Sequence, residues 1–286
     1  MRFSFIRQHA GTFPVRLLCQ TLEVSPSGYY AWQSREPSGR AGENERLLAQ
    51  IRTIHAGSGG RYGSPRVHAE LRRRGHRVGR RRVERLMRRH SICGIITPRR
   101  RPRTTDSHHR LPIAPNRLAR NFTAERPNRV WAADITYIPT DEGWLYLAAI
   151  IDLCTRKIVG WAMRDTLHAE IARAALAMAV QRQRPAPGLI HHSDRGVQYA
   201  SETFQADLAA AGLVCSMSRR GDALDNAPAE SFFHTLKTEL VHHRAYATRD
   251  EARRDLFAFI EGFYNTRRLH SALGYKSPAE MERLSA

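Results

Sequence analysis

The chain has 286 residues, of which 42% are hydrophobic, so it can bury a substantial core and hold one large domain with one or two small ones. Its longest apolar runs stay well below the roughly 18 residues of a membrane span, and charged side chains interrupt the hydrophobic residues near its start, so we expect neither a membrane span nor a signal sequence but a folded cytoplasmic protein. Its four cysteines include no Cys-x-x-Cys pair, which argues against a disulfide framework and a structural zinc site.

The net charge of +19 is unevenly distributed along the chain. Residues 1–126 contain 27 Lys and Arg against 8 Asp and Glu, whereas residues 127–286 contain 19 of each kind. The excess of positive charge therefore lies entirely in the first part. A basic module followed by a charge-balanced one indicates that the first binds a polyanion and the second carries a packed core with acidic chemistry.

The first 96 residues predict two pairs of short helices. In residues 12–33, spaced apolar residues lead to Ser25 and Pro26, an N-cap and a first-turn proline that open a second helix. A clearer pair follows, because Ser64 and Pro65 open a helix that Gly75 closes, and residues 80–90 form the next one. We therefore expect an N-terminal helical segment over residues 1–55 and a basic helix-turn-helix-like domain over residues 56–96.

The helix expected over residues 80–90 is rich in arginine. Its apolar residues Val83, Leu86 and Met87 recur at helical spacing and should face inward. That spacing leaves six arginines outside: Arg80, Arg81, Arg82, Arg85, Arg88 and Arg89. A merely solvated face favours mixed charges and only Glu84 offsets this run, so the pattern favours contact with DNA phosphates or a DNA groove.

The rest of the chain predicts a linker and then an α/β core. Residues 97–123 combine prolines and arginines without a sustained apolar period, which is typical of an extended basic linker. Strand-like runs at residues 130–138, 144–152 and 157–163 predict an antiparallel meander. Helices and short strands then alternate, at residues 168–183, 188–194, 202–212 and 213–217, before two helical stretches at 227–240 and 249–264. We expect a mixed sheet in a domain over residues 124–286.

Three acidic residues stand out in this domain. Asp134 lies within an apolar strand, where aspartate is disfavoured, and Asp194 follows a short buried strand, where a side chain can project into a cleft. Glu230 lies early in a helix that Asp225 or Asn226 can cap. Taken singly, the three could be a surface residue, a turn-former and a complement to the helix dipole.

The spacing of these acids and the sequence motifs around them point more specifically to one protein family. Between Asp194 and Glu230 lie 35 residues, and WAADITY, HHSDRGVQY and DNAPAESFF closely resemble the catalytic signature of insertion-sequence transposases and retroviral integrases. Similarity in YNTRRLHSALGYKSPAE and RYGSPRVHAELRRRGHRVG extends the resemblance over nearly the whole chain. The chain is most similar to second-reading-frame products of the IS-three group of bacterial insertion sequences, a resemblance that implies a ribonuclease H-like core.

The resemblance also implies a function and a site. It implies a DNA transposase that cuts strands and joins 3′-hydroxyl ends to target DNA, with Asp134, Asp194 and Glu230 as metal ligands. Two divalent cations, Mg²⁺ or Mn²⁺, would neutralise charge on the attacking and leaving oxygens. Lys237 shares a helical face with Glu230 and is expected to meet the DNA end, although a solvated residue is an equal alternative. Asp225 and Asn226 would support or cap the catalytic helix.

Two other functions stay open. The chain could be a non-catalytic DNA-binding or regulatory product that needs fusion to an upstream reading frame, or it could be a nuclease of the same fold. The expected partners are double-stranded DNA of the element ends and the target, further copies of the chain in a multimer on DNA, and an upstream-frame (OrfA-type) protein. No membrane partner is expected, and DNA binding would associate the protein with the bacterial nucleoid.

One departure from the family pattern precedes Glu230. Where relatives commonly show Gly-Asn-Cys and an aromatic residue, this chain has Gly-Asp-Ala-Leu at residues 221–224, so that Asp222 adds a negative charge to the loop. Other possible ligands are discounted. Asp152 ends a strand at an expected hairpin turn, and none of the histidines considered has a His or Cys partner at ligand spacing: His191, His192 and His270.

Overall fold

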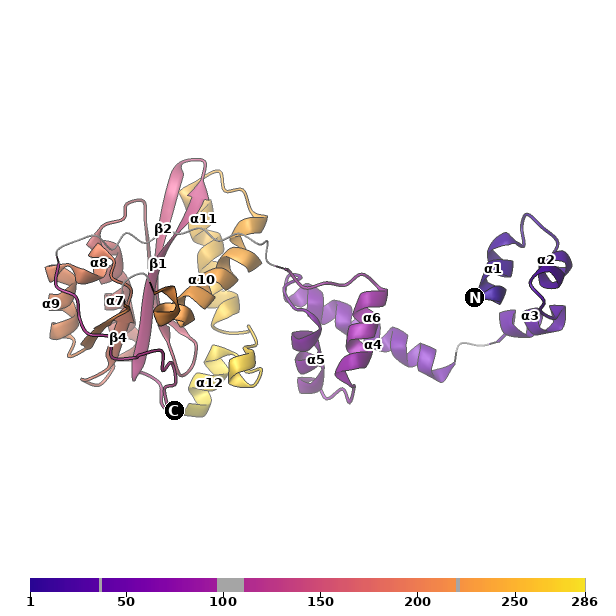
Figure 1. Cartoon of the computed structure of the whole chain (residues 1–286), viewed down its shortest axis with the longest axis horizontal. Coiled ribbons are helices and arrows are strands. Elements are labelled where there is room, and N and C mark those ends of the chain that lie inside the picture. Colours follow the sequence, from indigo (N-terminus) through magenta and orange to yellow (C-terminus); the bar gives the residue numbers. More distant parts are fainter. Residues whose placement is uncertain (36–37, 97–110, 220–221, 286) are drawn as a thin grey trace.

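The computed structural model describes residues 1–35, 38–96, 111–219 and 222–285. Figure 1 shows three parts in chain order: a group of three short helices, a bundle of three further helices, and a larger α/β part that contains the C-terminus. Among these residues, no helix has both the length and the apolar character needed to cross a membrane.

The first part is a small helical unit with a core of its own. It consists of α1 (Arg2–His9), α2 (Val15–Thr21) and α3 (Pro26–Gln33). The predicted start of α3 is confirmed, because the Gly28 backbone N–H donates to the Ser25 hydroxyl oxygen at 3.0 Å. Pro26 occupies the first turn of the helix, where its missing N–H costs no helical hydrogen bond.

The second part is a bundle of α4 (Gly39–Gly57), α5 (Ser64–Arg73) and α6 (Arg80–Arg89). The sequence patterns did not predict α4, whose first turns are almost wholly polar and whose buried residues begin only at Leu47. Leu47, Ile51 and Ile54 share a core with the apolar faces of α5 and α6. The boundary expected after residue 55 therefore falls inside a helix, and packing assigns α4 to the helix-turn-helix-like part.

The third part is built on a five-stranded mixed sheet, in the order β3-β2-β1-β4-β5. The strands are β1 (Val130–Thr140), β2 (Gly143–Asp152), β3 (Ile158–Arg164), β4 (Ile190–Ser193) and β5 (Val214–Met217). The first three are antiparallel, which confirms the predicted meander, and β4 and β5 run parallel to β1. The predicted mixed sheet is thus confirmed.

Helices cover both faces of this sheet (Figure 1). One face packs against α7 (Ala169–Gln183), α8 (Val197–Ala200) and α9 (Glu202–Ala210), and the other against α10 (Ala227–Glu239) and α11 (Arg249–Phe257). Successive residues of β1 point to opposite faces, so Trp131 and Ala133 join the first core while Ala132 and Ile138 join the second. Asp134 alternates in step with Ala132 and therefore faces α10.

The chain after α11 continues into a π-helical turn over Ala258–Tyr264, so the single helix expected at 249–264 is two elements. This turn brings the buried Asn265 side chain against the first residue of β3. Asn265 accepts the Ile158 N–H at 2.8 Å and donates to the Ile158 carbonyl at 3.0 Å. The chain ends in α12 (Pro278–Ser285), which the sequence patterns did not predict.

Half of the expected linker packs onto the α/β core. Residues 97–110 lie outside the described residues. In the remainder, Leu118 is buried in the core beneath α10, and the Asn116 side chain donates to Asp225 at 2.9 Å. The Arg117 N–H also donates to Ser216 of β5 at 3.0 Å. The segment from residue 111 onward is therefore part of the core rather than a spacer, because it satisfies buried polar groups there.

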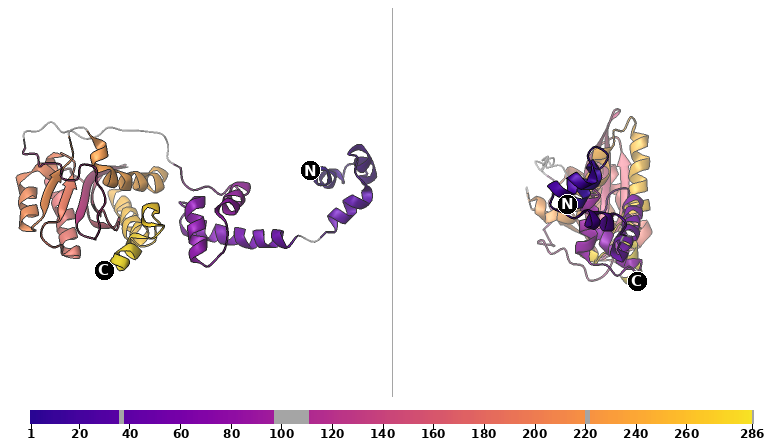
Figure 2. Two further views of the ribbon diagram at one scale, coloured as in Figure 1. Left: turned by 60° about the horizontal axis from the view of Figure 1, so that its bottom comes forward. Right: turned by 90° about the vertical axis from the view of Figure 1, so that its right-hand side faces the viewer.

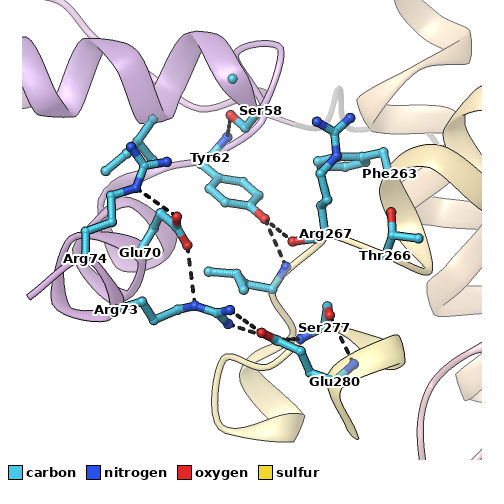
Figure 3. A pocket seen from close by; sticks show the side chains of 13 residues that line it. Ser58, Tyr62, Glu70, Arg73, Arg74, Phe263, Thr266, Arg267, Ser277 and Glu280 are labelled. Carbon is cyan, nitrogen blue, oxygen red and sulfur yellow. Dashed lines mark hydrogen bonds and ion pairs between the residues drawn. The ribbon is translucent and has the colours of Figure 1, made fainter. Parts of the chain in front are cut away.

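The helical bundle contacts the C-terminal region of the core (Figures 2 and 3). The Tyr62 hydroxyl donates to the Arg267 carbonyl and accepts the Leu269 N–H, both at 3.0 Å. Arg73 forms an ion pair with Glu280, and one of its hydrogen bonds measures 2.8 Å. These contacts surround a pocket of about 300 Å³, shown in Figure 3. The bundle and the core therefore share a specific polar interface.

Candidate active site

Asp134 and Asp194 come from neighbouring parallel strands. The pairing of β1 with β4 sets Ala132 opposite His192, and the same register carried two residues further sets Asp134 beside Asp194. Neighbouring strands lie about 4.8 Å apart, so this register brings the two carboxylates to one place. Local backbone groups hold both of them: the Ile135 N–H donates to Asp134 Oδ1 at 2.8 Å, and the Gly196 N–H donates to Asp194 Oδ1 at 2.9 Å.

Glu230 lies in the first turn of α10, and its charge acts on Asp134. Asn226, one helical turn earlier, donates its side-chain Nδ2 to the Ala133 carbonyl at 3.0 Å. Because Ala133 precedes Asp134, this bond fixes the start of α10 against β1 next to the first carboxylate. Asn226 occupies the N-cap position without a cap hydrogen bond, so of the two roles expected, capping or supporting the catalytic helix, its side chain takes the supporting one through its bond to the strand.

The three carboxylates form one electrostatic site. Burial, with the negative charges of Asp194 and Glu230, raises the pKa of Asp134 well above its ordinary value. Burial and the charge of Asp194 also raise the pKa of Glu230. A cation bound nearby would favour the ionised form of such carboxylates and so lower their pKa values. Among the described residues, no three His, Cys, Asp or Glu side chains form a group that could hold a metal ion in this conformation.

Lys237 lies beside this site, as its shared helical face with Glu230 predicted. Its Nζ sits 4.7 Å from the centroid of the Tyr137 ring on β1. The positive charge of Lys237 acts to lower the pKa of Asp134, while burial lowers the pKa of Lys237 itself. The lysine is therefore a half-buried cation next to the acidic cluster.

Asp225 connects the start of α10 to three other segments. Its buried carboxylate accepts the backbone N–H and the side chain of Arg219, at 2.8 and 2.9 Å, and the Nε of Arg120 at 3.2 Å. The Arg219 guanidinium holds the pKa of Asp225 far below its usual range. The Asp225 carbonyl is bonded by the buried His192 ring at 2.9 Å. The carboxylate of Asp225 thus points away from the acidic cluster and into a network of arginines.

The same network accounts for Asp222, the departure from the family pattern. Asp222 forms ion pairs with Arg120 and Arg219, the two arginines that also bind Asp225. The additional negative charge before α10 is therefore balanced within the protein. Only Asp222 and Leu224 of this altered stretch have described side chains, and Leu224 is exposed.

The discounted acid and two of the discounted histidines lie in structural positions. Asp152 is buried in the hairpin turn, where it accepts the backbone N–H and hydroxyl of Thr155, both at 2.8 Å, as predicted. His191 packs with its ring centroid 5.4 Å from that of Phe204, and burial lowers its pKa to about 3. His192 bonds Ser216 and the Asp225 carbonyl, so it also serves packing.

The arginines expected to face outward from α6 divide into two groups. Arg80, Arg81, Arg85, Arg88 and Arg89 are exposed. Arg82 is half-buried instead, because its Nε donates to Asn44 at 2.9 Å and its guanidinium pairs with Glu43 at 3.0 Å. Arg82 therefore attaches α6 to α4, a contact that could not be predicted while α4 itself was missed.

Sequence reasoning also missed Tyr199 and the partners of Asp225. Tyr199 is buried on α8, and burial together with the charges of Asp134 and Asp194 raises its pKa well above its ordinary value. Its position five residues after Asp194, within the word HHSDRGVQY, was the available signal. Arg120 gave no such signal, since it lies more than 100 residues before Asp225 in a segment that resembles a linker.

Family models match most of the chain. A model described as an HTH-like domain matches residues 43–101, and two described as an integrase core domain match residues 124–223 and 211–278. The HTH-like match begins within α4, in agreement with the packing of that helix.

Individual proteins are similar over almost the full length. The chain is 46% identical over 262 residues to an uncharacterized 31 kDa protein of insertion element IS600 from Shigella sonnei, covering 92% of this chain and 96% of that one. It is 38% identical over 284 residues to transposase InsF for insertion sequence IS3A from Escherichia coli (strain K12), covering 99% and 98%.

Solved structures are more distant. A simian T-cell lymphotropic virus intasome, in complex with PP2A regulatory subunit B56 gamma, aligns with 81% of this chain and 74% of that one, at 15% identity and a TM-score of 0.48. The HTLV-2 integrase catalytic core domain in complex with magnesium aligns with 56% and 99%, at 15% identity and a TM-score of 0.42. On its sequence relatives and domain matches, the chain belongs to the IS3 family of transposases, polynucleotidyl transferases with an HTH-like DNA-binding domain and a ribonuclease H-like integrase core that act in DNA transposition.

Proposed function

We propose that Asp134, Asp194 and Glu230 are the catalytic carboxylates of this transposase and bind two divalent cations, Mg²⁺ or Mn²⁺. The observation that supports this assignment most is the electrostatic coupling of the three side chains. They come from the middle of β1, the end of β4 and the first turn of α10, and the charges of Asp194 and Glu230 both act on Asp134.

The donor chemistry fits such cations. Carboxylate oxygens are hard ligands that suit Mg²⁺ and Mn²⁺, and a cation would offset the burial and the repulsion that together raise the pKa of Asp134. Asp134 is affected by both other acids, so it would help to hold both ions, and Asp194 and Glu230 would each help to hold one of them. Bound there, the two cations would stabilise the charge that develops on the attacking and leaving oxygens of phosphoryl transfer.

The remaining residues hold the site and the DNA. Asn226 keeps α10 against β1 through the Ala133 carbonyl, and Asp225 supports the same helix start through Arg219. Lys237, whose charge acts on Asp134, would contact the phosphate of the DNA end. The DNA backbone is further held by the exposed arginines of α6: Arg80, Arg81, Arg85, Arg88 and Arg89.

We also infer the state in which the protein works. Strand transfer joins DNA segments in pairs, so the active form is a homo-multimer on the element ends and the target. The upstream-frame (OrfA-type) product acts with it or is fused to it. The protein acts in the bacterial cytoplasm, at the nucleoid, because its substrate is the DNA of the element and the target.

Cleavage and joining of labelled element-end DNA test this function. The wild type should perform both reactions with Mg²⁺ or Mn²⁺, and Asp134→Asn, Asp194→Asn and Glu230→Gln should each lose both by about 10³-fold or more while still binding DNA. Asp165→Asn, an exposed acid outside the cluster, is the matched control and should stay active.

Three other outcomes would each reject part of the proposal. Activity in the triad variants would show that the assigned site is wrong. Hydrolysis without joining would identify a nuclease of the same fold. Binding without any reaction, even with the upstream-frame product present, would leave a DNA-binding or regulatory protein.

A further inference from the structure

A pocket of about 380 Å³ lies next to the proposed active site. Ser231 and Thr235 of α10 form part of its wall, and Ser231 follows Glu230 directly in the chain. Each residue of a helix turns about 100°, so the pocket occupies the helical face adjacent to the one that carries Glu230. The other walls come from the segment before β1, the β2–β3 turn, residues 264–272 and α5 of the bundle.

The charge of this pocket is strongly positive. Three arginines line it: Arg66, Arg156 and Arg268. Glu239 engages two of them, because the buried Arg268 donates to both of its carboxylate oxygens, at 3.1 and 2.7 Å, and Arg66 lies 3.8 Å away. One carboxylate thus serves two guanidinium groups, and the pocket has an excess of positive charge.

Arg156 differs from the other two arginines in its contacts. Within the described parts of the chain, its guanidinium forms neither a hydrogen bond nor an ion pair. Arg66 and Arg268, by contrast, have packing roles, since Arg66 Nε donates to the Leu269 carbonyl at 2.9 Å and Arg268 pairs with Glu239. Attachment of the bundle to the core therefore accounts for Arg66, and a buried ion pair within the core accounts for Arg268, which leaves Arg156 unexplained.

His270 also lines the pocket and offers a polar ring atom to a ligand. Burial and the charges of Arg268, Arg66 and Arg156 lower its pKa to about 3, so the ring is neutral at physiological pH. Its Nε2 has no hydrogen-bond partner among the described residues. A neutral imidazole can still donate one ring N–H to an anion.

The rest of the lining suits a sugar-phosphate chain better than a bare ion. Phe122 is partly exposed and supplies apolar surface that a deoxyribose can cover, whereas the buried Phe232 and Tyr264 form the floor of the pocket. Pro228, in the first turn of α10, places the positive end of that helix beside the pocket, which favours a negative ligand. The lining therefore combines positive charge, hydroxyl groups and aromatic rings.

We propose that this pocket binds a phosphodiester of the DNA strand that passes Glu230, with Arg156 as its principal contact. This inference rests on the proposed active site, because that site determines which strand lies alongside α10. The pocket extends the DNA-binding surface from the helical bundle to the catalytic helix, since Arg66 comes from the bundle and Ser231 from α10.

The test measures binding of the full chain to a labelled duplex that carries the element end, in EDTA and over a series of salt concentrations. Arg156→Gln should weaken binding about 3- to 10-fold and make the slope of log affinity against log salt shallower by about one, the change expected for one lost phosphate contact. Arg156→Lys keeps the charge and should restore most of the slope. Arg164→Gln, an exposed arginine at the end of β3, should leave the slope unchanged.

Duplexes with single methylphosphonates locate the phosphate. At one position, the neutral linkage should weaken DNA binding by the wild type. Arg156→Gln should bind that modified duplex as tightly as it binds unmodified DNA. A wild-type slope for Arg156→Gln, with its melting temperature unchanged, would overturn the proposal. A second result would also overturn it: inorganic phosphate raises the melting temperature of the wild type but not of Arg156→Gln, and the two proteins have the same salt dependence of DNA binding. The pocket would then bind free phosphate instead of DNA. Because EDTA removes divalent ions from the binding assay, these results would stand even if Asp134, Asp194 and Glu230 proved not to bind metal.

Discussion

The side chain of Asp225 is buried, yet it accepts hydrogen bonds from Arg219, Arg120 and Asn116. Arg219 lies just after β5, and Arg120 and Asn116 lie in the segment before β1, so one carboxylate ties both segments to the start of the catalytic helix. Asp225 and Asn226 were predicted to support or cap α10. The structure gives each a contact with a segment far away in the sequence, which a reading of local helix signals could not identify.

We expect Asp225→Asn to lower the free energy of unfolding by about 1–3 kcal/mol, because it weakens charge-assisted hydrogen bonds to partly exposed arginines. Cleavage should fall about 10-fold or more as the start of α10 loosens. Urea unfolding and the cleavage assay check the two effects. Asp222→Asn is the control and should cost less than about 1 kcal/mol, since Asp222 is more exposed. Wild-type stability and cleavage in Asp225→Asn would contradict this role.

The pH dependence of Asp225 follows from its lowered pKa. A carboxylate whose pKa is lower in the folded than in the unfolded protein stabilises the fold above the unfolded value, about 3.9, and loses that contribution as the pH falls further. The wild type should therefore lose more stability than Asp225→Asn as the pH falls below about 4.

At the scale of elements, the strands and most helices could be predicted because their patterns are local. Alternating apolar residues gave β1, β2 and β3, and the Ser25-Pro26 pair gave the start of α3. The polar first half of α4 hid a helix whose buried residues are set by contact with α5 and α6. The π-helical turn after α11 was also missed, since it depends on the bonds between Asn265 and β3.

Two neighbouring arginines of α6 should separate DNA binding from folding. Arg81 is exposed, so Arg81→Gln should make the salt dependence of DNA binding shallower by about one and leave stability unchanged. Arg82 binds Asn44 and Glu43, so Arg82→Gln should lower stability by about 1 kcal/mol with a smaller effect on the salt slope. Salt-titrated DNA binding and urea unfolding of both variants check this, and the reverse pattern would refute it.

The contact between the bundle and the C-terminal region depends on Tyr62, whose pKa burial raises further above its ordinary value. Tyr62→Phe removes the partner of the Leu269 N–H and of the Arg267 carbonyl, at a cost of about 1–3 kcal/mol for unpaired buried groups. Urea unfolding measures this loss. Tyr30→Phe, at an exposed tyrosine, should cost almost nothing, and equal stability of the two variants would show that the interface contributes little.

At the scale of the whole molecule, the acidic site depends on pairings that no local pattern contains. Asp134 and Asp194 meet because β1 pairs in parallel with β4, whose residues lie about 60 positions later in the chain. Their spacing and surrounding words allowed the site to be proposed from the family resemblance. Composition and periodicity alone gave a mixed sheet with three unusual acids, whereas the cationic pocket beside α10 required the positions of Arg66, Arg156 and Arg268 in space.

Counting the Mn²⁺ ions bound to the protein–DNA complex by electron paramagnetic resonance tests the central claim most directly. The wild type should bind two ions per active site, and Asp134→Asn, which removes the proposed bridging ligand, should lose binding of both. Asp194→Asn and Glu230→Gln should each weaken one site more than the other. Wild-type binding of Mn²⁺ by Asp134→Asn in the same complex would contradict the assignment of these three carboxylates as the metal site.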